Sequence, residues 1–220
     1  MRAISFVSYF CGKMSRSRVD LDVANFVNAV KGDAGESLFH LDTKDGHEAA
    51  EWFGEIGALA LTKKGLRLPI VLIPVPDSSC TWASDRMPRS ALLACSLARH
   101  LTNAVVIDAL RWRRKVKPSH EGGTRDPARL YANLTMLLTI PRGTSVVVDD
   151  VLTTGGHVRA AAARISTRSA HPCGHAICLA RTVPNREDEC FSIAEAEFPD
   201  FRPSGHERPW LPDCLHKAPS

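Results

Sequence analysis

The chain has 220 residues, of which 44% are hydrophobic and 24% are charged. These are ordinary values for a folded globular protein, and the length suffices for one α/β domain with an extension or for two small domains. The net charge of +4 suits small anions such as phosphates, but it is too small to indicate a nucleic-acid-binding protein by itself.

Cysteine usage and apolar runs exclude several classes of protein. The seven cysteines form no Cys-x-x-Cys pair, so the sequence suggests neither a disulfide framework nor a zinc ribbon. The first apolar stretch, Ala3–Tyr9, is too short for a signal peptide. No apolar run is long enough to cross a membrane, so we expect no membrane partner and a cytoplasmic protein.

Short apolar runs alternate with helical patterns along the chain. Runs bounded by Pro, Gly or polar residues predict buried parallel strands, and they cover residues 70–75, 104–107, 146–148 and 176–180. Apolar spacing or alanine content predicts helices over residues 47–63, 90–101 and 158–165. The alternation indicates an α/β fold in which helices flank a parallel sheet.

Two segments depart from this alternation. Residues 111–133 are rich in Arg and Lys without clear periodicity, which predicts a long mobile loop that ends in a helical or strand-like stretch. Such loops are often lids. Residues 183–220 start acidic and are rich in proline, which predicts an irregular extension. Its aromatic residues Phe198, Phe201 and Trp210 either form a hood over a bound base or pin the extension to the domain, the commoner case.

The segment Val146–Val158 carries the residues best suited to chemistry. An apolar strand ends in Asp149 and Asp150, a turn with two threonines and two glycines follows, and a helix begins. Glycines let backbone N–H groups approach a ligand, and together with a helix N-terminus these groups form an anion site suited to phosphate. Thr153 and Thr154 can add hydroxyl donors.

The two carboxylates narrow the ligand further. They would repel a phosphate unless they face a donor, and both ribose hydroxyls and Mg²⁺ meet that need. The alternative is a strand that merely ends in a polar turn, but all these residues in this order are uncommon. Neither a GxxxxGK[ST] nor a GxGxxG motif occurs. The segment therefore predicts a sugar-phosphate ligand.

The run Val146–Gly155 resembles the motif with which type I phosphoribosyltransferases bind phosphoribosyl pyrophosphate (PRPP). Other segments are similar to the ComF/GntX-like branch of that family, namely Leu72–Pro76, His120 with Arg129 and Asn133, Leu179–Thr182, and the pair Tyr9 and Lys31. The resemblance covers about residues 9–182. It implies a phosphoribosyltransferase-like domain over residues 1–182, followed by the extension 183–220.

The resemblance also implies roles for individual residues. Asp149 and Asp150 would hold the ribose hydroxyls and contact Mg²⁺ directly or indirectly. The 5′-phosphate would be cradled by the turn, which consists of Val151, Leu152, Thr153, Thr154, Gly155, Gly156 and His157. Pyrophosphate needs cations, and the candidates are Arg86, Arg89, Arg125 and Arg129. The implied reaction joins a nucleobase-like acceptor to the ribose of PRPP, and a homodimer is expected by family analogy.

Three departures from the ComF/GntX-like pattern favour a second hypothesis. The opening zinc-binding cysteine cluster is missing, His157 stands where the motif usually has Thr or Ser, and the loop 77–89 has only Arg86 and Arg89 as cations. The side chain of His157 can still donate to a phosphate, and its charge would vary near neutral pH. These features favour a PRPP- or nucleotide-binding protein without transferase activity, with a regulatory or DNA-uptake-associated role.

Two further patterns are weaker. The basic run Arg111–Lys117 contains one aromatic residue and leaves nucleic-acid contact open, although a solvated loop beside an anion site is the favoured interpretation. Two groups of His and Cys residues fit no common zinc spacing, and they are Cys190 with His206, Cys214 and His216, and His171 with Cys173 and His175.

Overall fold

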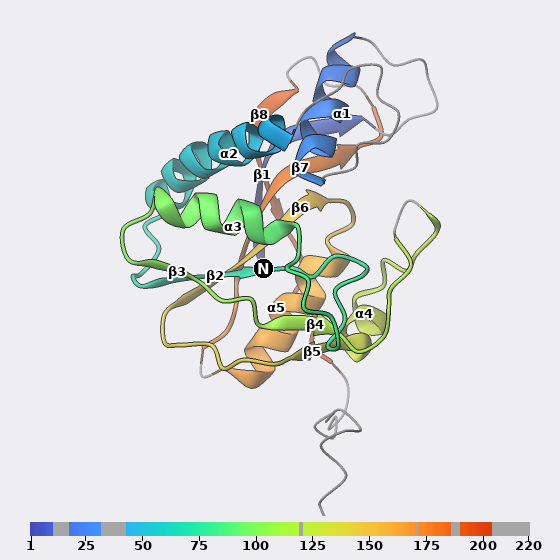
Figure 1. Cartoon of the computed structure of the whole chain (residues 1–220). Coiled ribbons are helices and arrows are strands. Elements are labelled where there is room, and N and C mark those ends of the chain that lie inside the picture. The colour runs from blue at the N-terminus through green and yellow to red at the C-terminus, as the bar shows by residue number, and fades with distance from the viewer. Residues whose placement is uncertain (11–17, 32–42, 119–120, 170, 186–189, 204–220) are drawn as a thin grey trace, which may run out of the picture.

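Helices and strands alternate along most of the chain, as the apolar runs predict (Figure 1). The computed structural model describes residues 1–10, 18–31, 43–118, 121–169, 171–185 and 190–203. The elements are β1 Arg2–Phe10, α1 Arg18–Lys31, α2 Thr43–Lys63, β2 Ile70–Pro74, α3 Ser90–Arg99, β3 Ala104–Val106, β4 Leu110–Trp112, α4 Pro127–Asn133, β5 Leu134–Met136, β6 Thr144–Leu152, α5 Gly156–Arg168, β7 His175–Val183 and β8 Phe191–Glu197. Among the described helices, none is long and apolar enough to cross a membrane.

The main sheet has six strands in the order β3-β2-β6-β7-β1-β8. The first five strands run parallel, and β8 pairs antiparallel with β1 at one edge. β4 and β5 form a separate two-stranded ribbon. The prediction of an α/β fold with a parallel sheet is therefore confirmed, and the antiparallel edge strand is an addition to it.

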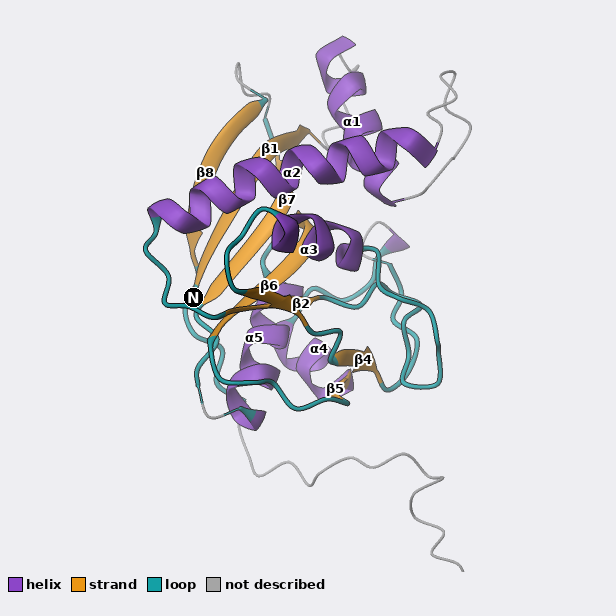
Figure 2. Cartoon of the chain, turned by 60° about the vertical axis from the view of Figure 1, so that its left-hand side comes forward, coloured by secondary structure: helices purple, strands orange, loops and turns teal. Residues whose placement is uncertain are grey.

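Helices cover both faces of the sheet (Figure 2). Helices α1, α2 and α3 pack on one face, where they bury Val146 and Val148 of β6. Helix α5 packs on the other face together with Val147. Successive side chains of a strand point to opposite faces, so a strand buried on both sides reads as a continuous apolar run. β2 shows the same pattern, since all five of its residues are buried.

The strand order gives the sheet a switch point between β2 and β6. From β2 the chain passes through α3 to β3 on one side, whereas from β6 it passes through α5 to β7 on the other. The two connections leave neighbouring strands in opposite directions and on opposite faces. In open α/β sheets, ligands bind in the crevice that such a reversal opens at the carboxyl ends of the strands.

Several sequence-based expectations need correction. β1 and α1 were not predicted, and β8 lies inside the segment expected to be irregular. Serines interrupt the apolar run of β1. In β8, alanines take several of the apolar positions, so the alternation of apolar and polar residues is weak, and neither segment gives a strong strand pattern. β3 is only partly buried, because it forms the opposite edge of the sheet. The expected loop 111–133 includes most of β4 and the whole of α4.

The extension is pinned to the domain after β8. The backbone N–H of Phe198 donates to the carbonyl oxygen of Met1 at 2.9 Å. The ring of Phe201 meets the ring of Tyr131 edge-on, with the centroids 5.7 Å apart. Both side chains pack against the core on the α5 face. Trp210 lies outside the described residues.

Candidate functional site at the carboxyl ends of strands β2 and β6

The strand, turn and helix predicted from Val146–Val158 are present. β6 extends through Asp149 and Asp150 to Leu152, so both acids lie within the last four residues of the strand rather than after it. Gly155 has a positive φ of 75°, a left-handed conformation that glycine adopts without strain, and α5 begins at the next residue. The half-buried acids and the helix N-terminus therefore lie on either side of one short turn.

Each carboxylate is oriented by the backbone next to it. Oδ1 of Asp149 accepts a hydrogen bond from the N–H of Asp150 at 2.9 Å, and Oδ1 of Asp150 accepts one from the N–H of Val151 at 2.7 Å. Cys178 lies beside Asp149 in the register of β7. Burial raises the pKa of the Cys178 thiol well above its ordinary value, and the charges of both aspartates raise this pKa further. The acids thus make the strand end electronegative.

The turn itself can receive an anion. The residue that caps α5 is Gly155, which has no side chain, and the amides in the first turn of a helix have no acceptor within the helix. Thr153 is half-buried and Thr154 is exposed beside these amides. A helix N-terminus of this kind attracts phosphate through its N–H groups and its dipole.

Two distant segments close around the turn. A Cβ atom on Gly155 would lie 2.6 Å from the ring of Phe198, so only glycine fits beneath that ring. A Cβ on Gly156 would overlap the carbonyl oxygen of Arg125. The two glycines therefore permit close approach by the C-terminal extension on one side and by the loop before α4 on the other.

His157 is directed at an aromatic residue of the β4–β5 ribbon. Its ring meets the indole of Trp112 edge-on, with the centroids 5.9 Å apart. Burial lowers the pKa of His157 below its ordinary value of 6.5, and the charge of Arg125 lowers it further although Asp150 opposes the shift. The histidine is therefore neutral at pH 7, and its ring packs against Trp112.

The loop 77–89 lies beside the acids. Pro74 is the register partner of Val148, and the N–H of Val75 donates to the carbonyl of Val148, so the loop leaves β2 next to Asp149. Asp77 folds the loop by accepting hydrogen bonds from the N–H and hydroxyl of Ser79 at 3.0 and 2.6 Å. The structure thus brings this loop and the acid pair together at the switch point.

The loop is also held by Trp112. Its indole N–H donates to the carbonyl oxygens of Pro76 and Asp77 at 3.1 and 3.0 Å. One side chain therefore supports the loop after β2 through its N–H and contacts His157 of α5 through its ring. This makes Trp112 the link between the two elements that flank the switch point.

The four candidate arginines are placed differently. Arg86 is exposed in the loop, and Arg89 is half-buried as the N-cap residue of α3. Arg125 is exposed, and its backbone touches the turn at Gly156. The side chain of Arg129 is 79% exposed and lies 3.7 Å from Asp126. The structure brings Arg125 to the turn, whereas Arg129 extends into solvent on α4.

The remaining predicted residues have structural placements or lie outside the description. The side-chain amide of Asn133 binds the backbone of Arg114, accepting from its N–H and donating to its carbonyl. In the basic run, Arg111 is buried and forms two hydrogen bonds with Asp108, and Trp112 is 1% exposed. Outside the described residues are His120, His206, Cys214 and His216, and only the backbone of Lys31 is described.

The acid pair suits Mg²⁺ that is bound together with water and substrate phosphates, rather than a metal ion held by protein ligands alone. Carboxylate oxygens are the ligands that Mg²⁺ prefers, and the ion usually completes its shell with water and substrate phosphates. No group of three or more His, Cys, Asp or Glu residues that could hold a metal occurs in the part of the chain described here. Cys173 is a poor metal ligand, because burial raises the pKa of its thiol to about 12.

Two site residues were not assigned from the sequence. The sequence places Trp112 only within a basic run, although an aromatic residue inside a charged stretch is itself a sign of an anchored segment. The sequence names Phe198 as a hood or anchor residue but not the place that it contacts, and only the fold shows that its ring covers Gly155.

No protein-family model matches the chain, and no curated protein matches it at a significant level.

Proposed function

We propose that this protein binds PRPP at the carboxyl ends of β2 and β6 and transfers its ribose 5-phosphate to a nucleobase-like acceptor. A pair of acids and an uncapped helix N-terminus at a topological switch point is the observation that carries this proposal. The first turn of α5 would hold the 5′-phosphate. Asp149 and Asp150 would accept hydrogen bonds from the 2′- and 3′-hydroxyls of the ribose.

In the proposed reaction, a nitrogen of the acceptor forms a bond to the anomeric carbon. The bond from that carbon to pyrophosphate breaks, and pyrophosphate leaves with the electron pair. Bound Mg²⁺ would supply positive charge to the pyrophosphate, and the acid pair provides suitable ligands. The protein's candidate cations for this group are Arg86 and Arg89, on the loop that leaves β2 next to Asp149, and Arg125 beside the turn. The homodimer and the cytoplasmic location belong to the same proposal.

Two observations favour a second function, a PRPP- or nucleotide-binding regulator without transfer activity. His157 packs its neutral ring on Trp112, at a position where the resembled motif offers a hydroxyl to the phosphate. Arg129 is engaged with Asp126 in solvent. Both features leave the ribose and phosphate sites in place while they reduce the groups available to stabilise a transition state.

The binding test replaces the acids and keeps their shape. Asp149→Asn with Asp150→Asn removes two charge-assisted hydrogen bonds worth about 1.5–3 kcal/mol each, so we expect the affinity for Mg-PRPP to fall at least 100-fold. Asp22→Asn, at an exposed position of α1, is the matched control and should bind normally. Calorimetry that finds equal affinity in the folded double variant would contradict the proposal.

The turnover test measures pyrophosphate release from PRPP over a panel of nucleobases. Release with one class of base supports the transferase. Tight PRPP binding without release for any base retains the ligand site and supports the regulator instead.

A further inference from the structure

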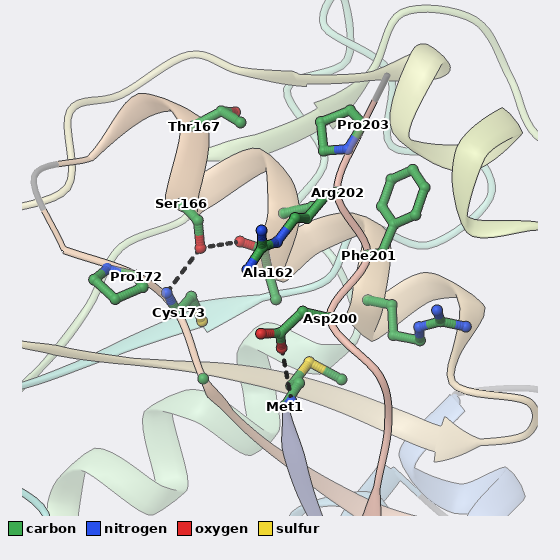
Figure 3. A pocket seen from close by; sticks show the side chains of 13 residues that line it. Met1, Ala162, Ser166, Thr167, Pro172, Cys173, Asp200, Phe201, Arg202 and Pro203 are labelled. Carbon is green, nitrogen blue, oxygen red and sulfur yellow. Dashed lines mark hydrogen bonds and ion pairs between the residues drawn. The ribbon is translucent and has the colours of Figure 1, made fainter. Parts of the chain in front are cut away.

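A cavity lies along helix α5, from Arg159 in its first turn to Thr167 near its end (Figure 3). It has a volume of about 320 Å³ and is bounded by α5, the start of the chain at β1, the residues before β7 and the segment 200–203. That volume is at the lower end of the range for small-molecule sites and exceeds what a single water needs. Neither Asp149 nor Asp150 lines it.

The Gly174 end of the cavity lies away from the acids along the sheet. Gly174 lines the cavity and precedes His175, which pairs with Val146 in the register of β6. Asp149 is therefore about 13 Å further along the sheet, at about 3.3 Å per residue. Gly174 thus lies away from the acids that would hold the ribose, and Arg159 is the wall residue that lies in the first turn of α5.

Most polar groups of the cavity wall are already engaged. The hydroxyl of Ser166 donates to the carbonyl of Ala162 at 2.8 Å and accepts from the N–H of Cys173 at 2.9 Å, as Figure 3 shows. Asp200 is 3.0 Å from the terminal ammonium of Met1, and this partner lowers the pKa of the Asp200 carboxyl. The thiol of Cys173 stays neutral because burial raises its pKa to about 12.

Two arginines are the exception. Arg159 and Arg202 line the cavity, and neither forms a hydrogen bond or an ion pair with any of the described residues. The Nε atom of Arg159 is buried without a partner, an unfavourable state for a charged group. Among the described residues, Asp200 is the only carboxylate in the wall, and its negative charge faces the ammonium of Met1 first and Arg202 second. The described part of the wall therefore has more positive than negative charge, beside the apolar surfaces of Ala162, Ala163 and Phe201.

We propose that this cavity is a second ligand site, which binds a small organic anion with a carboxylate or phosphate group and an apolar body. Arg159 and Arg202 would pair with the anionic group, and the alanine face of α5 and the ring of Phe201 would contact the apolar part. Arginine suits both anions because its planar guanidinium offers paired donors. The site does not depend on the function proposed for the acid pair.

The chain offers a variant that fills the cavity with little strain. A Cβ atom built on Gly174 meets no other atom within 4 Å, and Gly174 does not have a positive φ. Gly174→Leu should therefore place its side chain in the open space of the cavity while the protein stays folded. Arg159→Met with Arg202→Met removes the charges instead, and Arg168→Met, on the same helix but away from the cavity, is the matched control.

The experiment titrates the full chain with benzoate and with phenyl phosphate by calorimetry, with benzyl alcohol as the neutral probe. We expect saturable binding of at least one anion at one site per chain, and no binding of benzyl alcohol. The double arginine variant should bind at least tenfold more weakly, from the loss of charged hydrogen bonds of about 1.5 kcal/mol or more. Gly174→Leu should abolish binding, and Arg168→Met should bind normally.

The comparison of the two anions tells a carboxylate site from a phosphate site. The aspartate double variant at 149 and 150 should retain this binding, which separates it from the PRPP site. Equal affinity for benzyl alcohol, no saturable binding of either anion, or binding that survives Gly174→Leu would each overturn the proposal.

Discussion

The two faces of the sheet are covered by different kinds of side chain. On the face of α1, α2 and α3, large rings pack edge-on, such as Phe53 against Phe6 with the centroids 5.7 Å apart. On the face of α5, the side chains are small, and four consecutive alanines, Ala160–Ala163, are buried. Small side chains let a helix approach closely, whereas large rings bury more apolar surface per residue. The first face therefore supplies stability, and the second face positions the turn at the strand ends.

The largest effect on stability is expected when one ring is removed from the first face. Phe53 is fully buried in α2, and its replacement by Ala in a core is expected to lower the free energy of unfolding by about 3–5 kcal/mol. Binding of ribose 5-phosphate should be unchanged below the melting temperature, because α2 lies on the other face from α5. Denaturant unfolding and calorimetry together check this. Loss of binding in the folded Phe53→Ala protein would mean that the two faces are not independent.

The next largest effect is expected at Gly155 on the second face. Gly155→Ala introduces strain of about 1–3 kcal/mol at a positive φ, and the new Cβ also overlaps Phe198. The matched control is Gly65→Ala, since Gly65 has a φ of 62° but no atom within 4 Å of its Cβ position. Gly65→Ala thus reports the backbone strain alone.

The difference between the two glycine variants isolates the contact with Phe198. We expect Gly155→Ala to destabilise more than Gly65→Ala and to weaken ribose 5-phosphate binding, which Gly65→Ala leaves intact. Adding Phe198→Ala to Gly155→Ala should restore part of the binding. If the two glycine variants lose equal stability and bind equally well, Phe198 does not cover the turn.

These contacts show what the sequence could and could not predict. The order of strand, acids, turn and α5 is local, so the residues of Val146–Val158 predicted it directly. The parallel strands β2, β3, β6 and β7 were predicted from apolar runs. The contacts of Trp112 and Phe198 with the turn join segments far apart in the chain, and no local pattern encodes them. Arg129 was chosen by its spacing to Asn133, but spacing does not determine which way α4 faces.

A smaller effect is expected when the motif's usual residue is restored at position 157. His157→Thr gives up the ring contact with Trp112 and places a hydroxyl beside the first turn of α5. One added hydrogen bond is worth about 0.5–1.5 kcal/mol, so we expect phosphate affinity to rise by about 2- to 10-fold. His157→Val has nearly the same shape without the hydroxyl and is the control. Equal affinities in the Thr and Val variants would show that position 157 does not face the phosphate.

The smallest effect on stability is expected from an ion-pair group on the first face. It distinguishes the contribution of charged side chains from that of the buried rings. Glu51 of α2 binds Ser96 and Arg99 of α3 and His100, the residue that follows α3. The hydrogen bond from Arg99 is the largest cause that lowers the pKa of Glu51, from 4.5 to about 2. Because the folded-state pKa is depressed, this contribution to stability is present above pH 4.5 and is lost as the pH falls toward 2. Glu51→Gln should melt slightly below the parent protein at pH 7, and the difference should vanish toward pH 2.

Thermal melts of both proteins across this pH range measure the effect, and Glu55→Gln, at an exposed position on the same helix, should show no such pH dependence. The expected difference in melting temperature is small, because solvent screens exposed ion pairs and they contribute little to the free energy of unfolding. A difference for Glu51→Gln that persists unchanged at low pH would mean that its charge is not what joins α2 to α3. Ribose 5-phosphate binding should be insensitive to Glu51→Gln at neutral pH, since the pair lies on the face that does not carry the turn.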